Sequence, residues 1–435
     1  MGKLTRRQLA QSALASATIA PWASFASSNG AGQASTIPSN NSSDTGVTDS
    51  EIVLGVSTAF KGPSRGLGIE LYRGAVSYFA KVNDQGGVHG RRIVLKLRND
   101  GYQPVPAVEN SVKLIVDDKV FALFGYVGTP TVTRVLPVLK KFQDRDFLLF
   151  FPFTGAQPQR QPPYGEFAFN LRASYRQETA GLVDNLVAIG RNRIAVFYQA
   201  DAYGRSGWAG VRAALREHNS RLVGEATYRR GEQYTAVMRQ QVERLKKVNP
   251  DAVICIGAYA ACAAFARDAI DAGLEIPIAN LSFVGSENLL KKLTDEFGTE
   301  SEKYSRWLVN SQVVPSYESL SMASVREYAD LMTRYNPTPP AEFEQHDYLP
   351  FAKSFVSLEG FLNAKLMTEI LTRAGPSPSR ALLEDAVFSI QQYDLGIDEQ
   401  VDFSPERRQG LDQVYYTIVE ENRFVDLTDW QAKFA

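Results

Sequence analysis

Short apolar segments and longer segments of helical periodicity alternate along the chain from residue 51 onward. Residues 51–57 (EIVLGVS) form a short apolar run of the kind expected for a buried strand. The next segment, 66–82, places Leu71, Ala75, Phe79 and Val82 on one face of a helix. Further strands are predicted at 92–98, 120–125 and 147–152, with helices between them at 105–117 and 131–142. Such an alternation implies parallel strands joined by right-handed crossovers.

The same alternation begins again after residue 170. The chain is therefore expected to be an α/β protein with two doubly wound, Rossmann-like lobes. Residues 317–400 are predicted to be mainly helical. Two C-terminal strands, 414–419 and 423–427, are predicted to form a hairpin that turns at Glu421-Asn422. In the second unit, strands are predicted at 193–198, 222–228, 251–257 and 278–284, and helices near 175–189, 204–218, 234–248 and 258–272.

The charge balance narrows the range of partners. The 435 residues include 47 basic and 48 acidic side chains, which gives a net charge of −1. Binding to phosphates needs an excess of Lys and Arg on one face, so nucleic acid is not expected as a partner. Charged residues interrupt the apolar stretch 349–371, and no uninterrupted run of about 18 apolar residues follows the N-terminus. We therefore expect no direct insertion of the mature chain into a membrane.

The first residues are predicted to be a targeting signal rather than part of the fold. Lys3, Arg6 and Arg7 precede a mildly apolar stretch, and small residues before Ala26 suit cleavage after that residue. Thr5-Arg6-Arg7-Gln8-Leu9 resembles a twin-arginine export signal; an ordinary Sec signal is the alternative. Residues 1–26 are thus expected to be a signal peptide that directs the protein to the periplasm. Residues 27–47, which are rich in Ser, Asn, Gly and Thr, are expected to be a flexible leader.

Motifs of common catalytic and metal sites are absent from the sequence. It contains no G-x-S-x-G, G-x-x-x-x-G-K-[ST] or H-E-x-x-H motif. His89, His218 and His346 are widely separated, so no metal site is expected. Gly66-Leu67-Gly68 makes half of a dinucleotide fingerprint, but Leu71 occupies the third Gly position. We therefore expect no enzyme activity and no cofactor.

The two cysteines leave two interpretations open. Cys255 falls in a predicted buried strand and Cys262 in the helix that follows it. Six residues separate them, so they do not form a C-x-x-C redox motif. They are expected to be small buried hydrophobes or, in an oxidising compartment, a disulfide.

The loops at the carboxyl ends of the strands are the places where an open α/β sheet binds ligands. In the first unit these loops are 58–68, 125–131 and 151–156. In the second unit these loops contain Asp201-Ala202-Tyr203-Gly204, Ala258-Tyr259 and Gly285-Ser286-Glu287. Thr129, at a helix N-terminus, suits an anionic group, or it serves as an N-cap; the two roles are compatible. Two lobes facing each other across these loops would form a cleft.

Several of these residues resemble a known family. The most specific stretch runs from Asn83 to Arg91, with the pattern N-x-x-G-G-[IV]-x-G-[RK]. The sequence resembles the type I periplasmic solute-binding proteins, in the leucine/isoleucine/valine-binding branch that serves ABC importers. Other matching residues are Gly62-Pro63 with Gly68, Gly74-Ala75, Asn99-Asp100, Gly125 with Gly128-Thr129, Asp201-Ala202-Tyr203-Gly204-Arg205 and Pro250-Asp251-Ala252-Val253.

The resemblance implies two lobes that close around a ligand at a hinge of three segments. The chain would cross between lobes near 170–175, 308–317 and 400–410. The first lobe would then combine 48–170 with 313–400, and the second 171–312 with 401–435. The implied partners are a small-molecule ligand and the membrane permease of an ABC transporter.

The resemblance also implies which residues bind the ligand. Thr129 and the loop at Phe153-Thr154 would hold a carboxylate, and Glu287 would meet an ammonium group, with aromatic support from Tyr203 and Tyr259. Tyr126 and the bulky Phe153 would make the cleft more aromatic than is usual in the family. The first crossing, Arg172-Ala173-Ser174-Tyr175-Arg176, lacks the Asp found in some amino-acid binders.

Three functions remain open at this point. The first is a periplasmic binding protein that captures an amino acid or an aromatic acid for an ABC importer; a larger, lipid-like ligand is an alternative. The second is a ligand-sensing module for a membrane receptor. The third is an exported enzyme that folds around a cofactor before export.

Overall fold

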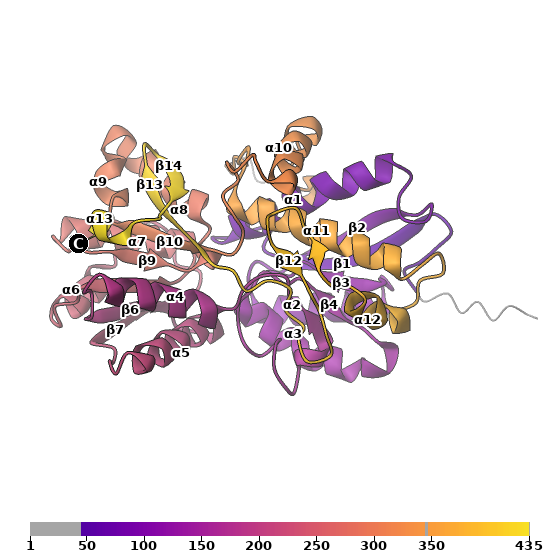
Figure 1. Ribbon diagram of the computed structural model, residues 1–435, viewed down its shortest axis with the longest axis horizontal. Helices are drawn as coiled ribbons and strands as arrows, with labels where there is room; N and C mark the ends of the chain where they lie inside the picture. Colours follow the sequence, from indigo (N-terminus) through magenta and orange to yellow (C-terminus); the bar gives the residue numbers. More distant parts are fainter. Residues whose placement is uncertain (1–44, 344–346, 435) are drawn as a thin grey trace, which may run out of the picture. The chain divides into compact units, whose positions relative to one another are not determined.

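The computed structural model of the protein describes residues 45–343 and 347–434 (Figure 1). All of them belong to one compact unit, Ser43–Ala435. The predicted signal peptide, most of the predicted leader and His346 lie outside the described residues. The last leader residues belong to the fold, since Val47 pairs with Ile52 and the amide of Val53 donates to Gly46 O at 2.8 Å.

The first lobe is built on a parallel sheet with the strand order β2-β1-β3-β4-β5. Helices cover both of its faces, so most of its strands are buried on both sides, while Arg92–Asn99 at the edge is partly exposed. Ile52, Leu54 and Val56 of β1 join a core with α1, α11 and α12, while Val53 packs against a second core with α2 and α3. The strands are β1 (Glu51–Thr58), β2 (Arg92–Asn99), β3 (Ala122–Phe124), β4 (Leu149–Phe150) and β5 (Ala168–Phe169), and the helices are α1 (Arg65–Asp84), α2 (Pro104–Val116), α3 (Thr129–Lys141), α10 (Ala323–Tyr335), α11 (Phe355–Arg373) and α12 (Arg380–Phe388).

The second lobe repeats this arrangement. Its sheet has the order β14-β13-β10-β9-β8-β6-β7, and the five parallel strands within it, β7-β6-β8-β9-β10, follow the same order as the first sheet. Strands β13 and β14 form an antiparallel hairpin at the edge. The elements are β6 (Ile194–Gln199), β7 (Gly224–Tyr228), β8 (Ala252–Ile256), β9 (Ile278–Asn280), β10 (Leu308–Gln312), β13 (Tyr415–Glu420), β14 (Arg423–Asp426), α4 (Tyr175–Ala188), α5 (Ala202–Glu217), α6 (Arg239–Lys246), α7 (Tyr259–Asp271), α8 (Ser286–Phe297), α9 (Ser301–Ser305) and α13 (Trp430–Phe434).

The predicted hairpin is confirmed, and several predicted strands are shorter than expected, among them the strand predicted at 120–125, which is observed at Ala122–Phe124. The hairpin turns at Glu421 and Asn422, both with positive φ (47° and 58°), as a two-residue turn requires. The strand predicted at 147–152 pairs only at Leu149–Phe150, because the backbone of Phe151 is left-handed (φ 53°). The strand predicted at 278–284 ends at Asn280 and continues as a 3-10 turn over Ser282–Val284.

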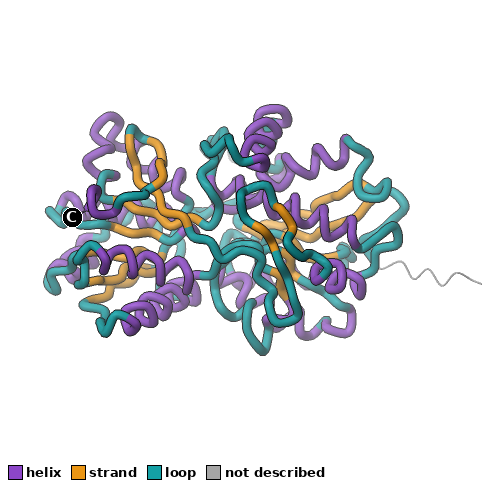
Figure 2. Tube along the Cα trace, viewed as in Figure 1, coloured by secondary structure: helices purple, strands orange, loops and turns teal. Residues whose placement is uncertain are grey.

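Within the described residues, the chain passes between the two sheets through the segments 170–174, 313–322 and 402–414 (Figure 2). The first and third segments are hydrogen-bonded to each other. The amide of Asn170 donates to Arg408 O at 2.9 Å, and the amide of Leu411 donates to Leu171 O at 2.8 Å. We propose these three segments as the hinge and as the boundaries of the lobes.

Two glycines allow α1 and α11 to pack closely in the first lobe. A Cβ on Gly74 would lie 1.7 Å from Ser357 O, and a Cβ on Gly360 would lie 2.0 Å from Leu71 O. No other residue fits at these positions without moving the helices apart. The contact fixes α11 against the helix that begins at the ligand-side loop after β1.

Candidate functional site

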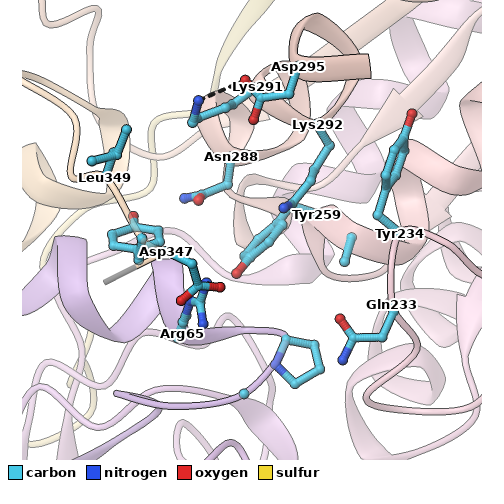
Figure 3. A pocket seen from close by; sticks show the side chains of 14 residues that line it. Arg65, Gln233, Tyr234, Tyr259, Asn288, Lys291, Lys292, Asp295, Asp347 and Leu349 are labelled. Atoms are coloured by element: carbon cyan, nitrogen blue, oxygen red, sulfur yellow. Dashed lines mark hydrogen bonds and ion pairs between the residues drawn. The ribbon is translucent and has the colours of Figure 1, made fainter. Parts of the chain in front are cut away.

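A pocket of about 430 Å³ opens between the two lobes (Figure 3). We call it the mouth pocket. Its walls carry charge from both lobes: Arg65 pairs with Asp347 at 2.6 Å, and Lys291 pairs with Asp295 at 2.8 Å. The lining residues are Gly62, Pro63, Arg65, Asp347, Tyr348 and Leu349 from the first lobe and Gln233, Tyr234, Tyr259, Ala260, Asn288, Lys291, Lys292 and Asp295 from the second.

Beneath the mouth pocket the two lobes are in contact. The Tyr259 hydroxyl, which Figure 3 shows reaching into the pocket, accepts a hydrogen bond from the amide of Gly66 at 3.2 Å. Deeper in, Gln199 Nε2 of the second lobe donates to the Tyr102 hydroxyl of the first at 3.1 Å. Apolar residues of both lobes merge here into one buried cluster. The structure therefore has its cleft closed.

Five buried aromatic side chains, which we call the aromatic cluster, pack together where the two lobes meet. Tyr102 and Phe153 come from the first lobe, and Tyr175, Tyr203 and Phe283 from the second. The ring of Phe283 lies at the centre, with ring centroids 5.7 Å from Tyr102, 5.3 Å from Phe153 and 4.6 Å from Tyr203. Tyr175 packs on Tyr203 at 5.1 Å. Such rings present a surface suited to an apolar or aromatic ligand.

Hydroxyl groups meet at one edge of the aromatic cluster. Thr129 Oγ1 lies 2.7 Å from Thr154 Oγ1 and donates to the Tyr175 hydroxyl at 3.4 Å. Thr129 is the first residue of α3, and Gly128 takes the capping position before it, so the expectation that Thr129 is an N-cap is wrong. A Cβ on Gly128 would lie 2.2 Å from the Tyr102 ring. The glycine thus allows Tyr102 to lie directly beside the pair of threonines.

The first crossing contributes a buried guanidinium. Arg172 is 1% exposed, and its guanidinium carbon lies 4.6 Å from the centre of the Phe153 ring. It pairs with Glu178 of α4 and Glu359 of α11, each at 3.5 Å, and donates to Ser282 Oγ. The neighbouring carboxylates hold its pKa above the ordinary value despite burial. The guanidinium therefore stays charged and bridges elements of both lobes.

Glu287 and Tyr126 lie outside the aromatic cluster. Glu287, in the first turn of α8, accepts a hydrogen bond from the amide of Phe355 at 3.1 Å, which is also a contact between lobes. Burial raises the pKa of its carboxyl to about 7. Tyr126 is fully buried in the core between α2 and α3, where its hydroxyl lies 3.1 Å from Ser111 Oγ. These are the surroundings of a core side chain, so we do not include Tyr126 in the proposed site.

Comparison with known proteins identifies the family. A family model described as "Periplasmic binding protein" matches residues 51–423. This chain belongs to the periplasmic binding protein family. Leu/Ile/Val-binding protein homolog 3 of Brucella melitensis biotype 1 is 23% identical over 226 residues, which are 52% of this chain and 59% of that protein. The matched segments of two further curated relatives span 48% and 65% of their own lengths.

Solved structures extend the likeness over both lobes. A possible leucine/isoleucine/valine-binding protein from Rhodopirellula baltica SH 1 is 30% identical, with a TM-score of 0.78 over 89% of this chain and 98% of that chain. A branched chain amino acid ABC transporter protein from Thermus thermophilus with bound valine is 15% identical, with a TM-score of 0.75 over 88% and 97%. The second likeness bears on the fold alone. The predicted family and the predicted two-lobed α/β fold are confirmed.

Membership in the family supports a solute-binding role. Periplasmic binding proteins are solute-binding proteins rather than enzymes, and the members of the family are periplasmic. The described residues contain no group of three or more His, Cys, Asp or Glu that could hold a metal ion. Nor does any helix among them combine the length and the apolar composition that crossing a membrane requires.

The two described histidines have local partners, and the two cysteines are buried. His218 pairs with Asp184 at 2.6 Å, and the His89 ring lies 2.9 Å from Thr372 O. Cys255 and Cys262 are both free and buried. The structure therefore corresponds to the small-hydrophobe interpretation of the cysteines and not to the disulfide.

Of the residues predicted from sequence, the fold of this binding protein brings Thr129, Phe153, Thr154 and Tyr203 together, and it places Tyr259 at the mouth pocket. Sequence reasoning missed Tyr102, Tyr175, Phe283 and Arg172 as cleft residues. Tyr102 lies in the loop that begins after the end of β2 at Asn99, so the strand-end argument could have found it. Phe283 falls within a predicted strand, and Arg172 belongs to the crossing that was singled out only because it lacks an Asp found in some amino-acid binders.

Proposed function

We propose that this protein captures a small carboxylate-bearing solute in the cleft between its lobes and delivers it to the membrane permease of an ABC importer. The observation that carries the proposal is the meeting of hydroxyls from the first lobe with aromatic rings from both lobes around one buried centre. Thr129 and Thr154 supply hydroxyls for a carboxylate, and Tyr203 and Phe283 supply an apolar surface opposite them. Relatives are named as a Leu/Ile/Val-binding protein homolog and a possible leucine/isoleucine/valine-binding protein. These names support a ligand of about the size of an amino acid.

Binding would proceed by closure of the hinge. An open cleft admits the solute, and the contacts between lobes, such as Tyr259 with Gly66, form around it. Phe153, Thr154 and Tyr203 become inaccessible in the closed state, so the ligand is removed from water. Glu287 is proposed to meet an ammonium group if the ligand has one.

The first test is native mass spectrometry of freshly purified protein, followed by a thermal-shift screen of amino acids and aromatic acids. A ligand at 100 times its dissociation constant should stabilise the protein by about 2.7 kcal/mol. Failure to find any co-purifying solute or any stabilising acid would count against the proposal. A pull-down that recovers permease proteins would favour transport over sensing by a membrane receptor, and recovery of a receptor would favour the reverse.

The route of export is proposed from the sequence. An Arg6→Lys/Arg7→Lys double variant keeps the charge but not the guanidinium geometry. Under the twin-arginine proposal it should remain in the cytoplasm, which fractionation and immunoblotting would detect. Normal export of the variant would mean that the Sec route is used.

A further inference from the structure

Arg172 and Tyr203 both have buried polar atoms without a hydrogen bond in the closed cleft. Arg172 Nε, Arg172 Nη1 and the Tyr203 hydroxyl are buried and make no hydrogen bond. A guanidinium has donors only, and a tyrosine hydroxyl can donate. All three of these atoms can therefore donate, and a buried donor without a partner costs free energy.

The two carboxylates that face Arg172 are already engaged. Glu178 Oε2 accepts from the amide of Ser282 at 2.8 Å and from Ser311 Oγ at 2.7 Å, and Glu178 Oε1 faces Arg172. Glu359 Oε1 faces Arg172 Nη1 at 3.5 Å as an ion pair. The remaining side of the guanidinium has no acceptor from the protein. A ligand that satisfies the free donors of Arg172 must therefore bring oxygen acceptors of its own.

The position of the surplus donors connects them to the aromatic cluster. Arg172 stacks over Phe153, and Tyr203 packs on Tyr175 and Phe283. A ligand with an acidic group and a ring could therefore place the acid at Arg172 and the ring against these side chains. A guanidinium donates to a carboxylate through two parallel bonds, an arrangement that a lone ammonium cannot match.

An amino-acid ligand would also need an acceptor for its ammonium group at the same place. Glu178 is saturated, and Glu359 is paired with Arg172. Burial raises the pKa of Glu359 to about 7, which weakens it as a permanent negative charge. Glu287, the residue expected to meet an ammonium, lies outside the aromatic cluster; its Oε1 accepts from the Phe355 amide, and its Oε2 makes no hydrogen bond.

We propose that Arg172 anchors the carboxylate of an aromatic acid that lacks an α-ammonium group, with the ring of the acid held in the aromatic cluster. This inference rests on the proposed function and narrows its class of solute. Arg172 thereby becomes a residue that determines specificity within the leucine/isoleucine/valine-binding branch.

Calorimetry of the wild-type protein with four probes tests the proposal without any variant. Benzoate and phenylacetate carry the acid and the ring, benzamide carries the ring without the charge, and phenylalanine adds the ammonium. At least one of the two acids should bind at least about tenfold more tightly than benzamide and phenylalanine do. The native mass spectrum should likewise show a co-purifying carboxylic acid without an amine.

The outcomes separate this inference from the proposed function. Tighter binding of phenylalanine or leucine than of either acid, or a co-purifying amino acid, overturns the inference and leaves solute capture intact. A co-purifying solute without a carboxylate overturns the inference and the carboxylate part of the proposed function. The absence of any bound solute overturns both.

A pair of variants then assigns the effect to Arg172. Arg172→Lys keeps the positive charge between Glu178 and Glu359 but removes the planar donors, so affinity for the acid should fall about tenfold or more. Arg380→Lys is the matched control, because Arg380 is also buried and stacked, on Phe147 at 4.2 Å, but lies in the first lobe away from the cluster. Equal affinities of Arg172→Lys and Arg380→Lys would overturn the assignment. If Arg172→Lys fails to fold, the comparison of benzoate with benzamide on the wild-type protein decides.

Discussion

At the residue scale, Glu287 is a carboxyl group that folding removes from water. Desolvation raises the pKa of Glu287 to about 7, although the hydrogen bond from the Phe355 amide lowers it. An unfolded glutamate has a pKa of about 4.3. Between these values the native state binds a proton that the unfolded state lacks, so stability falls as pH rises through this window. In Glu287→Gln the group cannot ionise. From about pH 5 to about pH 8, the wild-type free energy of unfolding should fall by up to about 3 kcal/mol relative to the variant.

Urea denaturation at several pH values measures this difference. Glu359, whose pKa is also raised to about 7, titrates in both proteins and therefore cancels in the comparison. Glu109→Gln, on the exposed side of α2, controls for the loss of one negative charge. Parallel curves for the wild type and Glu287→Gln would contradict the pH linkage of this group.

A substitution of Thr129 is expected to change the affinity for the solute without changing the shape of the side chain. Thr129→Val removes the hydroxyl that contacts Thr154 and Tyr175 and should weaken binding of the co-purifying solute about tenfold. The control is Thr133→Val, one turn further along α3, whose hydroxyl donates to the carbonyl of Thr129 at 2.7 Å. Calorimetry should find the control unchanged. A similar loss in both variants would indicate a general effect on the helix.

The sequence predicted part of this site because strand ends are visible in an apolar pattern. Thr129, Thr154 and Tyr203 each follow a predicted strand, and the fold brings them together as that rule implies. Tyr126 also follows a strand, but its side chain points into the core. The sequence pattern alone does not show in which direction such a side chain points. Arg172 could not be found in this way because its role depends on Glu359, which is 187 residues away (359 − 172).

At the scale of elements, α1 and α11 approach so closely that backbone meets backbone. An alanine at position 360 would place its Cβ 2.0 Å from Leu71 O, and a helix backbone cannot turn aside as a side chain can. Gly360→Ala should therefore lower the free energy of unfolding by about 3 kcal/mol, in spite of the better helix propensity of alanine. Thermal or urea denaturation would measure the change.

Gly181→Ala in α4 is a useful contrast to Gly360→Ala. Its Cβ would meet the hydroxyl of Tyr416 at 1.8 Å, which is the far end of a half-buried side chain. That ring can rotate away, so the cost should be about 1 kcal/mol or less. Equal losses in the two variants would show that contact with backbone is not what matters.

The elements themselves were largely predictable because their periodicity is strong. The alternation of 51–57 with 66–82 corresponds to β1 and α1, and the Glu421-Asn422 turn was located by its residue types. Ends of strands were less predictable. Phe151 is a residue type that is common in strands, but its backbone is left-handed. Ser282–Val284 is as apolar as a strand, but it forms a 3-10 turn. In both cases the chain bends at the cleft, where tertiary contacts override local preference.

At the scale of the whole molecule, closure should be visible in the exchange of one amide. Gly66 lies in the first turn of α1, where amides have no partner within the helix, and its amide donates across the cleft to Tyr259. A bound solute that favours closure should therefore slow hydrogen exchange at Gly66. The amide of Val253, which donates to Pro277 O within the second lobe, should change little and serves as control. Equal slowing at both amides would indicate general stabilisation rather than closure.

The cysteine content of the protein has a practical consequence. Both cysteines of the chain, Cys255 and Cys262, are buried, and burial raises the pKa of the Cys255 thiol further from reactivity. A single cysteine placed at the exposed Glu109 in the first lobe and another at the exposed Glu217 in the second would thus be the accessible targets for a maleimide. A donor and an acceptor dye attached there would turn the protein into an optical sensor for its own solute, with no mutation of the native thiols required.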